Sequence, residues 1–164
     1  MITDAYKTYL GRDPDPAGLR FWLGKMASGW TTSQIESGFL ASTEYFPRVD
    51  TATISYNFEW VGQVYVSVLG RHPSLDEQLS WLHRMSMFGW PGLTRTQVAM
   101  DFLLSSENLA PVVDGYYRAL LGRSLDPSGQ ATWVRILQTG GRDEDVIGAI
   151  IASDEYWGNV PSPA

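Results

Sequence analysis

The stretch Tyr6-Lys7-Thr8-Tyr9-Leu10-Gly11-Arg12 decides the fold, because this chain contains it in three versions. The other two are Tyr65-Val66-Ser67-Val68-Leu69-Gly70-Arg71 and Tyr117-Arg118-Ala119-Leu120-Leu121-Gly122-Arg123. In every version a Trp follows the Arg by ten residues, and a Ser-x-Glu triplet comes later, at Ser42, Ser105 and Ser153. A pattern that returns with this period indicates stacked supersecondary units. We call the three versions, with the residues around each, copies 1, 2 and 3.

The composition is that of a folded protein and excludes several classes. The chain has 164 residues, of which 44% are apolar and 18% charged, and it contains no Cys. Disulfides and thiolate metal sites are therefore excluded. The net charge of −6 makes a nucleic-acid partner improbable, because such proteins usually carry a basic face. No apolar run is long enough to span a bilayer, and residues 1–4 lack the layout of a signal peptide, although the chain can be a fragment of a larger protein.

Helix start and stop signals recur at equivalent places in the copies. Gly11 follows an apolar stretch and is expected to end the first helix. Asp15 and Asp126 each precede a Pro, and this pair is typical of a helix N-cap followed by the first helical position. Copy 2 instead has Ser74 with Glu77 three residues later, which is a capping box.

The apolar spacing predicts an all-α protein of three tandem four-helix units packed around a nearly continuous core. The second helix of copy 1 is expected to bury Leu19, Trp22, Leu23 and Met26, and that of copy 2 to be the most buried of the three. The stretch from Val49 to Trp60 is expected to be extended. The predicted divisions are repeat 1 at 1–49, a linker at 50–59, repeat 2 at 60–111, repeat 3 at 112–160 and a tail at 161–164.

Each repeated Arg is expected to form an ion pair with the Glu of its own Ser-x-Glu triplet or to bond to nearby helix-end carbonyls. The predicted pairs are Arg12 with Glu44, Arg71 with Glu107, and Arg123 with Glu155. A guanidinium group suits this role because its planar fork can satisfy several acceptors at once. Breaking such a pair, where it is buried, costs roughly 3–5 kcal/mol. The alternative is an anion site. We favour the ion pair, because a residue that recurs in every copy more often serves the fold.

The residues give little support for catalysis or metal binding. Residues 13–18 resemble the start of a calcium loop, but Ala17 and Gly24 stand where that loop needs oxygen ligands, so we expect Asp13 and Asp15 to serve the helix start. The two histidines, His72 and His83, have no ligand spacing. No nucleophile elbow, phosphate loop or dinucleotide fingerprint is present. We therefore expect no metal, no cofactor and no enzymatic activity.

Aromatic residues outside the repeat are the best functional lead. Trp30 and Trp90 each follow a Gly that ends the second helix of their copy, and Trp157 follows the last Ser-x-Glu triplet. Trp faces suit sugar rings or partner side chains. The alternative is that each Trp packs back onto its own unit.

The pattern Tyr-x-x-x-Leu-Gly-Arg-x-x-Asp-x-x-Gly, followed by Trp, Gly and Ser-x-Glu-Tyr, closely resembles the bacterial family named domain of unknown function 4214. Copy 1 matches it at Tyr6, Leu10-Gly11-Arg12, Asp15, Gly18-Leu19, Trp22, Gly29, Phe39, Ser42 and Glu44-Tyr45. Copy 3 matches at Tyr117, Leu121-Gly122-Arg123, Asp126, Gly129, Trp133, Gly140, Ser153 and Glu155-Tyr156. Copy 2 departs from it at Ser74, near Gln78 and at Asn108.

The resemblance implies a non-catalytic module of larger secreted, cell-surface or phage-tail proteins, and it supplies no established ligand residues. A fainter likeness to linker proteins of cyanobacterial antennae points to protein partners. Two functions follow as hypotheses. The first is recognition of a surface glycan or another cell-surface or matrix component by loop aromatics. The second is a structural linker that binds other protein subunits, in an extracellular, cell-surface or virion-tail setting.

Overall fold

The structure is a computed structural model that describes residues 1–47, 54–85 and 92–158. The all-α class is confirmed, because these residues form helices and no strand. None of the described helices is both long and apolar enough to cross a bilayer. The chain divides into two compact units, Met1–Leu103 and Leu104–Ala164, and each is described by itself.

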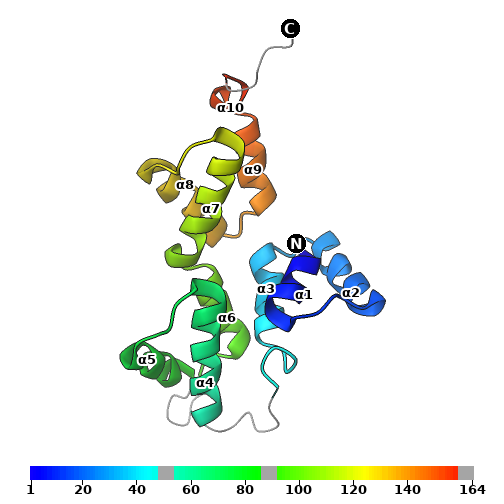
Figure 1. Ribbon diagram of the computed structural model, residues 1–164, viewed down its shortest axis with the longest axis vertical. Helices are drawn as coiled ribbons and strands as arrows, with labels where there is room; N and C mark the ends of the chain where they lie inside the picture. The colour runs from blue at the N-terminus through cyan, green and yellow to red at the C-terminus, as the bar shows by residue number, and fades with distance from the viewer. Residues whose placement is uncertain (48–53, 86–91, 159–164) are drawn as a thin grey trace. The chain divides into compact units, whose positions relative to one another are not determined.

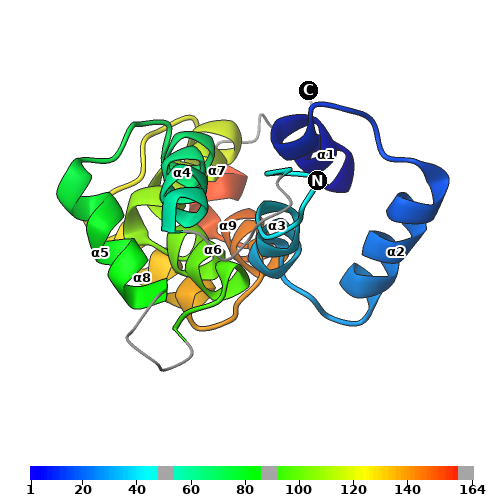
Figure 2. The same ribbon diagram turned by 90° about the horizontal axis from the view of Figure 1, so that it is seen from below.

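Unit 1 holds copy 1 and most of copy 2. Its elements are α1 (Ile2–Leu10), α2 (Pro16–Ala27), α3 (Thr32–Leu40), α4 (Ile54–Val64), the π-helical turn η1 (Tyr65–Leu69), α5 (Leu75–Met85) and α6 (Arg95–Leu103). Within this unit α3 lies between α6 on one side and α1 and α2 on the other (Figures 1 and 2).

Unit 2 holds the end of copy 2 and all of copy 3. Its elements are α7 (Ser106–Leu121), α8 (Pro127–Gln138), α9 (Asp143–Ile151) and α10 (Asp154–Gly158). The last helix of copy 2 and the first helix of copy 3 are one continuous helix, α7, so the predicted boundary at residues 111 and 112 falls inside it (Figure 1).

The repeated glycines end the first helix of every copy. Gly11, Gly70 and Gly122 have φ of 66°, 67° and 69°, a left-handed conformation that a residue without Cβ adopts at little cost. The predicted stop at Gly11 is confirmed. The chain then turns and starts the second helix of the copy five residues after the Gly.

Copies 1 and 2 share packing within unit 1. Trp60 is fully buried, and its indole Nε1 donates a hydrogen bond of 2.9 Å to the carbonyl of Leu40, at the end of α3. The hydroxyl of Tyr56 donates to the carbonyl of Phe46 at 2.6 Å. The buried residues form two clusters, one in copy 1 and one around α4 and α6, and Tyr9 packs against both. The core of unit 1 is therefore shared between copies through a few aromatic contacts.

Unit 2 has a core of its own, built by α7, α8 and α9. Its buried residues are Leu109, Val113, Tyr117, Val134, Leu137, Val146 and Ile150.

Two expectations about copy 2 were wrong. The stretch from Val49 to Trp60 is not extended throughout, since α4 begins at Ile54 and overlaps the predicted linker at 50–59. The second helix of copy 2, α5, is not the most buried. Leu82 is its buried residue, whereas 61% of Leu75 and 49% of Leu79 are exposed.

Candidate functional site

Arg12 joins three segments of copy 1. Its Nη2 donates to Oε2 of Glu44 at 3.0 Å, in the turn that follows α3. Its Nη1 lies 3.6 Å from Oδ2 of Asp15, the N-cap residue of α2. The guanidinium carbon is 4.9 Å from the ring centroid of Tyr6, on α1. One side chain thus connects the end of α1, the start of α2 and the turn that follows α3.

Arg123 repeats this arrangement in copy 3. Its Nη2 donates to Glu155 at 2.8 Å and its Nη1 to Asp126 at 3.0 Å. Its guanidinium carbon lies 4.9 Å from the ring centroid of Tyr117. The equivalent Glu, Asp and Tyr partners in a second copy indicate a part of the scaffold rather than a site built once for a ligand.

Copy 2 has no Asp at the helix cap, so the carboxylate that Asp15 and Asp126 place beside the Arg comes from another residue there. Ser74 stands at the cap position, and Glu77 receives Nη2 of Arg71 at 2.8 Å and the backbone N–H of Ser74 at 2.7 Å. Arg71 lies 4.9 Å from the ring centroid of Tyr65, as in the other copies. Glu77 occupies the position that Gly holds in copies 1 and 3. The predicted pairing of Arg71 with Glu107 would link residues of different units and stays a prediction.

These contacts hold the carboxylates in their ionised form. Hydrogen bonds from Arg12 and Arg123 lower the pKa of Glu44 and of Glu155. Asp15 and Asp126 accept hydrogen bonds from backbone N–H groups at the start of their helices. These bonds, first the ones from Gly18 and Gly129, lower the pKa of the two carboxyls. The hydrogen bond from Arg71, followed by the one from Ser74, lowers the pKa of Glu77 to about 2.

The arginine clusters are neither buried nor open to a ligand. The exposed fraction of the side chain is 39% for Arg12 and 48% for Glu44. The roughly 3–5 kcal/mol estimated above for breaking a buried pair therefore does not apply, because exposed ion pairs contribute little to the free energy of unfolding. Nε and Nη2 of Arg12 bond to Glu44, and Nη1 donates to the carbonyl of Asp13. The donor fork is already occupied. These clusters position helices.

The three Trp residues predicted to bind a ligand differ in their surroundings. Trp30 is half-buried against the core of copy 1, and Nζ of Lys25 lies 4.4 Å from its ring centroid. Trp157 is 62% exposed and meets the ring of Tyr156 edge-on at 5.7 Å. Trp90 lies outside the described residues. Trp157 is therefore the one of the two described that offers an open aromatic face.

The acidic residues at the start of α2 are engaged with the protein itself. Asp15 accepts hydrogen bonds from the N–H groups of Ala17 and Gly18 at 3.0 and 2.9 Å. Asp13 lies 3.3 Å from Nζ of Lys7. Across the described parts of the chain, no three His, Asp or Glu side chains are grouped as metal ligands.

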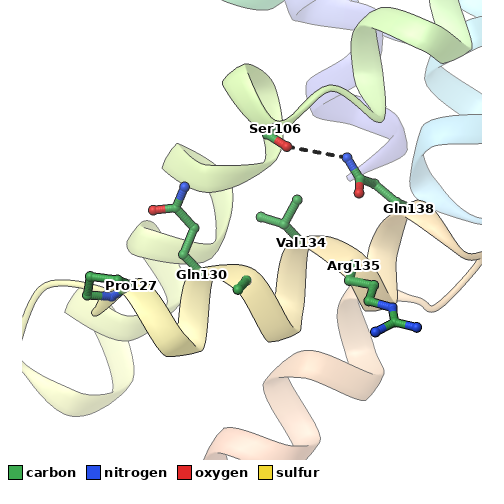
Figure 3. A pocket seen from close by; sticks show the side chains of 7 residues that line it. Ser106, Pro127, Gln130, Val134, Arg135 and Gln138 are labelled. Atoms are coloured by element: carbon green, nitrogen blue, oxygen red, sulfur yellow. Dashed lines mark hydrogen bonds between the residues drawn. The ribbon is translucent and has the colours of Figure 1, made fainter.

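Unit 2 has a shallow hollow of about 290 Å³ along α8 (Figure 3). It lies between α8 and the start of α7, where Nε2 of Gln138 donates to the carbonyl of Leu104 at 2.8 Å and to Oγ of Ser106 at 3.4 Å. Its lining residues are Ser106, Pro127, Gln130, Ala131, Val134, Arg135 and Gln138. The lining contains amides but no aromatic ring, so it lacks the stacking face of a typical sugar site.

Among the described residues of copy 1, the most exposed large apolar side chains lie on α2. Phe21 is 56% and Leu23 50% exposed, and no residue of α2 is buried. Counting from the Trp of each copy, Leu82 and Val134 occupy the position of Leu23, and they are 7% and 5% exposed. Lys25 lies at the border of this surface. Its Nζ, which lies over the ring of Trp30, is also 5.5 Å from the ring centroid of Phe21. We call the side chains of Phe21 and Leu23 the open face of α2.

Sequence reasoning missed this face, because the helical spacing assigned Leu23 to the core. No local signal separates the copies here, because Leu23 follows the repeated Trp just as Leu82 and Val134 do.

Residues 1–49 match the sequence model of a family described as a domain of unknown function (DUF4214). No curated protein and no solved structure matches the chain.

Proposed function

We propose, from the match of residues 1–49 to the DUF4214 family model and from the open face of α2, that this protein is a non-catalytic assembly module that binds other protein subunits. The single observation that carries the proposal is the exposure of Phe21 and Leu23 on α2. At the same position the other copies bury Leu82 and Val134. An apolar surface that has buried counterparts in the same chain is best explained by a protein partner.

The arginine clusters support a scaffold role. They recur with the same Arg–Tyr distance of 4.9 Å in all three copies and do not involve the two residues of the open face. We include in the proposal an extracellular, cell-surface or virion-tail setting, which the resemblance to this family implies.

The test is site-specific photocrosslinking in cells that produce the protein. We expect p-benzoylphenylalanine in place of Phe21 to form adducts with one or a few defined protein species, and we expect Leu23→Asp to abolish them. The matched control carries the same group in place of Thr132, the exposed counterpart of Phe21 on α8. Equal protein adducts from both positions, or none from position 21, would overturn the proposal.

Recognition of a surface glycan is the second candidate, and the exposed ring of Trp157 favours it. Asp154 is exposed on the same helix and can accept sugar hydroxyls. A glycan-array screen compares the wild type with Trp157→Ala and Trp30→Ala. Binding to a defined glycan that only Trp157→Ala abolishes would establish this function instead.

A further inference from the structure

We propose that helix α8 binds an acidic segment of a protein partner, with a carboxylate of that segment paired to Arg135. The inference goes beyond the proposed function, because it places a second binding surface on unit 2 and makes no use of the open face of α2. The surface consists of two hollows along α8 and of two polar side chains that the protein itself does not use.

The two hollows meet along α8. The first is the hollow of about 290 Å³ described above, and the second has about 450 Å³. Ala131 and Arg135 line both hollows and therefore form the border between them. The second hollow is also lined by Thr132, Ile136 and Thr139. Because Ala131 has only a methyl side chain, a ligand that lies across it reaches both hollows.

Arg135 carries a charge without a partner. Most of the described arginines pair with a carboxylate, as Arg84 does with Asp101 and Arg118 with Asp114, each at 2.6 Å. Arg135 is exposed and forms no ion pair or side-chain hydrogen bond with the described residues, and α8 contains no Asp or Glu. Its planar fork is therefore free to bind a carboxylate through two parallel hydrogen bonds.

The amide of Gln130 is the second free group. It is exposed in the first hollow and makes no side-chain hydrogen bond within the described parts of the chain, whereas the amide of Gln138 donates to Leu104 and Ser106. Figure 3 shows the guanidinium of Arg135 pointing away from Gln130, to the other side of α8. An amide both donates and accepts hydrogen bonds, as a peptide group does. A segment whose carboxylate binds Arg135 can therefore bond to Gln130 with its backbone.

Copy 2 has neither the free amide nor the small border residue. Counting from the repeated Trp, Gln78 is the counterpart of Gln130, and its Nε2 donates to the carbonyl of Phe58 at 3.0 Å. In place of Ala131 copy 2 has Leu79, whose larger side chain would fill the border between the hollows.

The cation is also particular to copy 3. The residues equivalent to Arg135 are Gly24 in copy 1 and His83 in copy 2. The arginine clusters that recur in every copy position helices, whereas this combination of groups occurs in a single copy. It is therefore not required by the scaffold, which leaves it available for a ligand.

An acidic peptide fits this surface better than the other anions of similar chemistry. The residues that line the two hollows include no aromatic ring for stacking on a sugar. A nucleic acid would be repelled by the net charge of −6, whereas a short acidic segment needs a single cation and hydrogen-bonding groups beside it.

Selection from a phage-displayed library of random peptides on the immobilised full chain tests the inference. We expect the enriched peptides to share an Asp or Glu. Synthetic copies of them should bind in fluorescence polarisation with a dissociation constant on the order of 10–100 μM, because the contact is small. Added NaCl should weaken binding by screening the charges. No enrichment, or enriched peptides without an acidic residue, overturns the inference.

Two variants remove one feature of the site each. Arg135→Gln should weaken binding of the selected peptides by at least about tenfold, because it removes the charge-assisted hydrogen bonds. Ala131→Leu, which introduces the residue of copy 2, should weaken it by filling the border between the hollows. Both positions are exposed, so circular dichroism should show wild-type helicity. Unchanged affinity in Arg135→Gln overturns the inference.

Arg20→Gln is the matched control for charge, because Arg20 is also exposed and forms no ion pair with the described residues, but lies on α2. It should bind the selected peptides as the wild type does. A loss equal to that in Arg135→Gln would mean that the peptides respond to overall charge and would overturn the site. Oligogalacturonate serves as the acidic glycan probe. Binding of this probe through Arg135 without any enriched acidic peptide would also overturn the inference.

This inference and the proposed function can fail separately. Thr132, the control position for crosslinking, lines the second hollow, so that control is repeated in the Arg135→Gln background. Specific crosslinks from position 21, combined with no peptide binding at α8, would reject this inference and leave the proposed function standing. Peptide binding that depends on Arg135, combined with no crosslinks from position 21, would have the opposite meaning.

Discussion

Helices α2 and α8 occupy the same position in copies 1 and 3, and yet they differ in how many of their side chains are buried. Both begin with an Asp cap and a Pro, and both carry the repeated Trp, Trp22 or Trp133. α8 buries Val134 and Leu137, whereas α2 buries none of its residues. Local signals therefore set where each helix begins, and the neighbouring segment decides what it buries.

The largest expected effect compares one substitution at the two equivalent positions. Val134→Asp places a charge without a partner in the core of unit 2 and should destabilise that unit by about 4 kcal/mol. Leu23→Asp places the same group on an exposed surface and should change stability by no more than about 0.5 kcal/mol. Urea denaturation followed by far-UV circular dichroism measures both. Equal losses would show that α2 is covered within the chain and would remove the open face.

A smaller contrast lies within α2, between its two helical glycines. A Cβ on Gly18 would lie 2.1 Å from the hydroxyl oxygen of Tyr6, whose side chain is buried, whereas a Cβ on Gly24 would meet no atom within 4 Å. Gly18→Ala should therefore destabilise the protein by about 1–3 kcal/mol. Gly24→Ala should stabilise it by about 0.5–1 kcal/mol, because Ala favours the helix. Thermal melts of the two variants test whether α2 packs against the protein at Gly18 and not at Gly24. Shifts of the melting temperature with the same sign in both variants would contradict this.

Features encoded within a few residues could be predicted from the sequence. The stop at Gly11 and the start at Asp15-Pro16 depend on hydrogen bonds between near neighbours, so the residues that make them are visible in the sequence. The repeat also indicated a long-range contact, between Arg12 and Glu44, which the structure brings together.

Features that depend on another segment could not be predicted in this way. The Thr and Tyr content of the stretch before Trp60 favoured an extended chain, but burial of Tyr56 and Trp60 makes it helical from Ile54. Leu23 fits an apolar helical face by spacing, yet it is 50% exposed, whereas Val134 at the equivalent position is 5% exposed. Spacing within one helix does not say which other segment packs against it.

The smallest expected effect concerns what the copies share. In copy 2 the pKa of Glu77 is lowered from 4.5 to about 2, chiefly by the hydrogen bond from Arg71. A carboxyl with a lowered pKa in the folded state stabilises the protein above pH 4.5, and this contribution is lost as the pH falls toward 2. Glu77→Gln removes the titrating group, so the stability of the variant should fall less steeply than that of the wild type between these pH values. Asp76→Asn, which removes a neighbouring exposed carboxylate and leaves the Arg71 contact in place, should keep the wild-type slope. Parallel curves for the wild type and Glu77→Gln would mean that Glu77 does not replace the Asp of the other copies, and that copy 2 holds its helices together by a different contact.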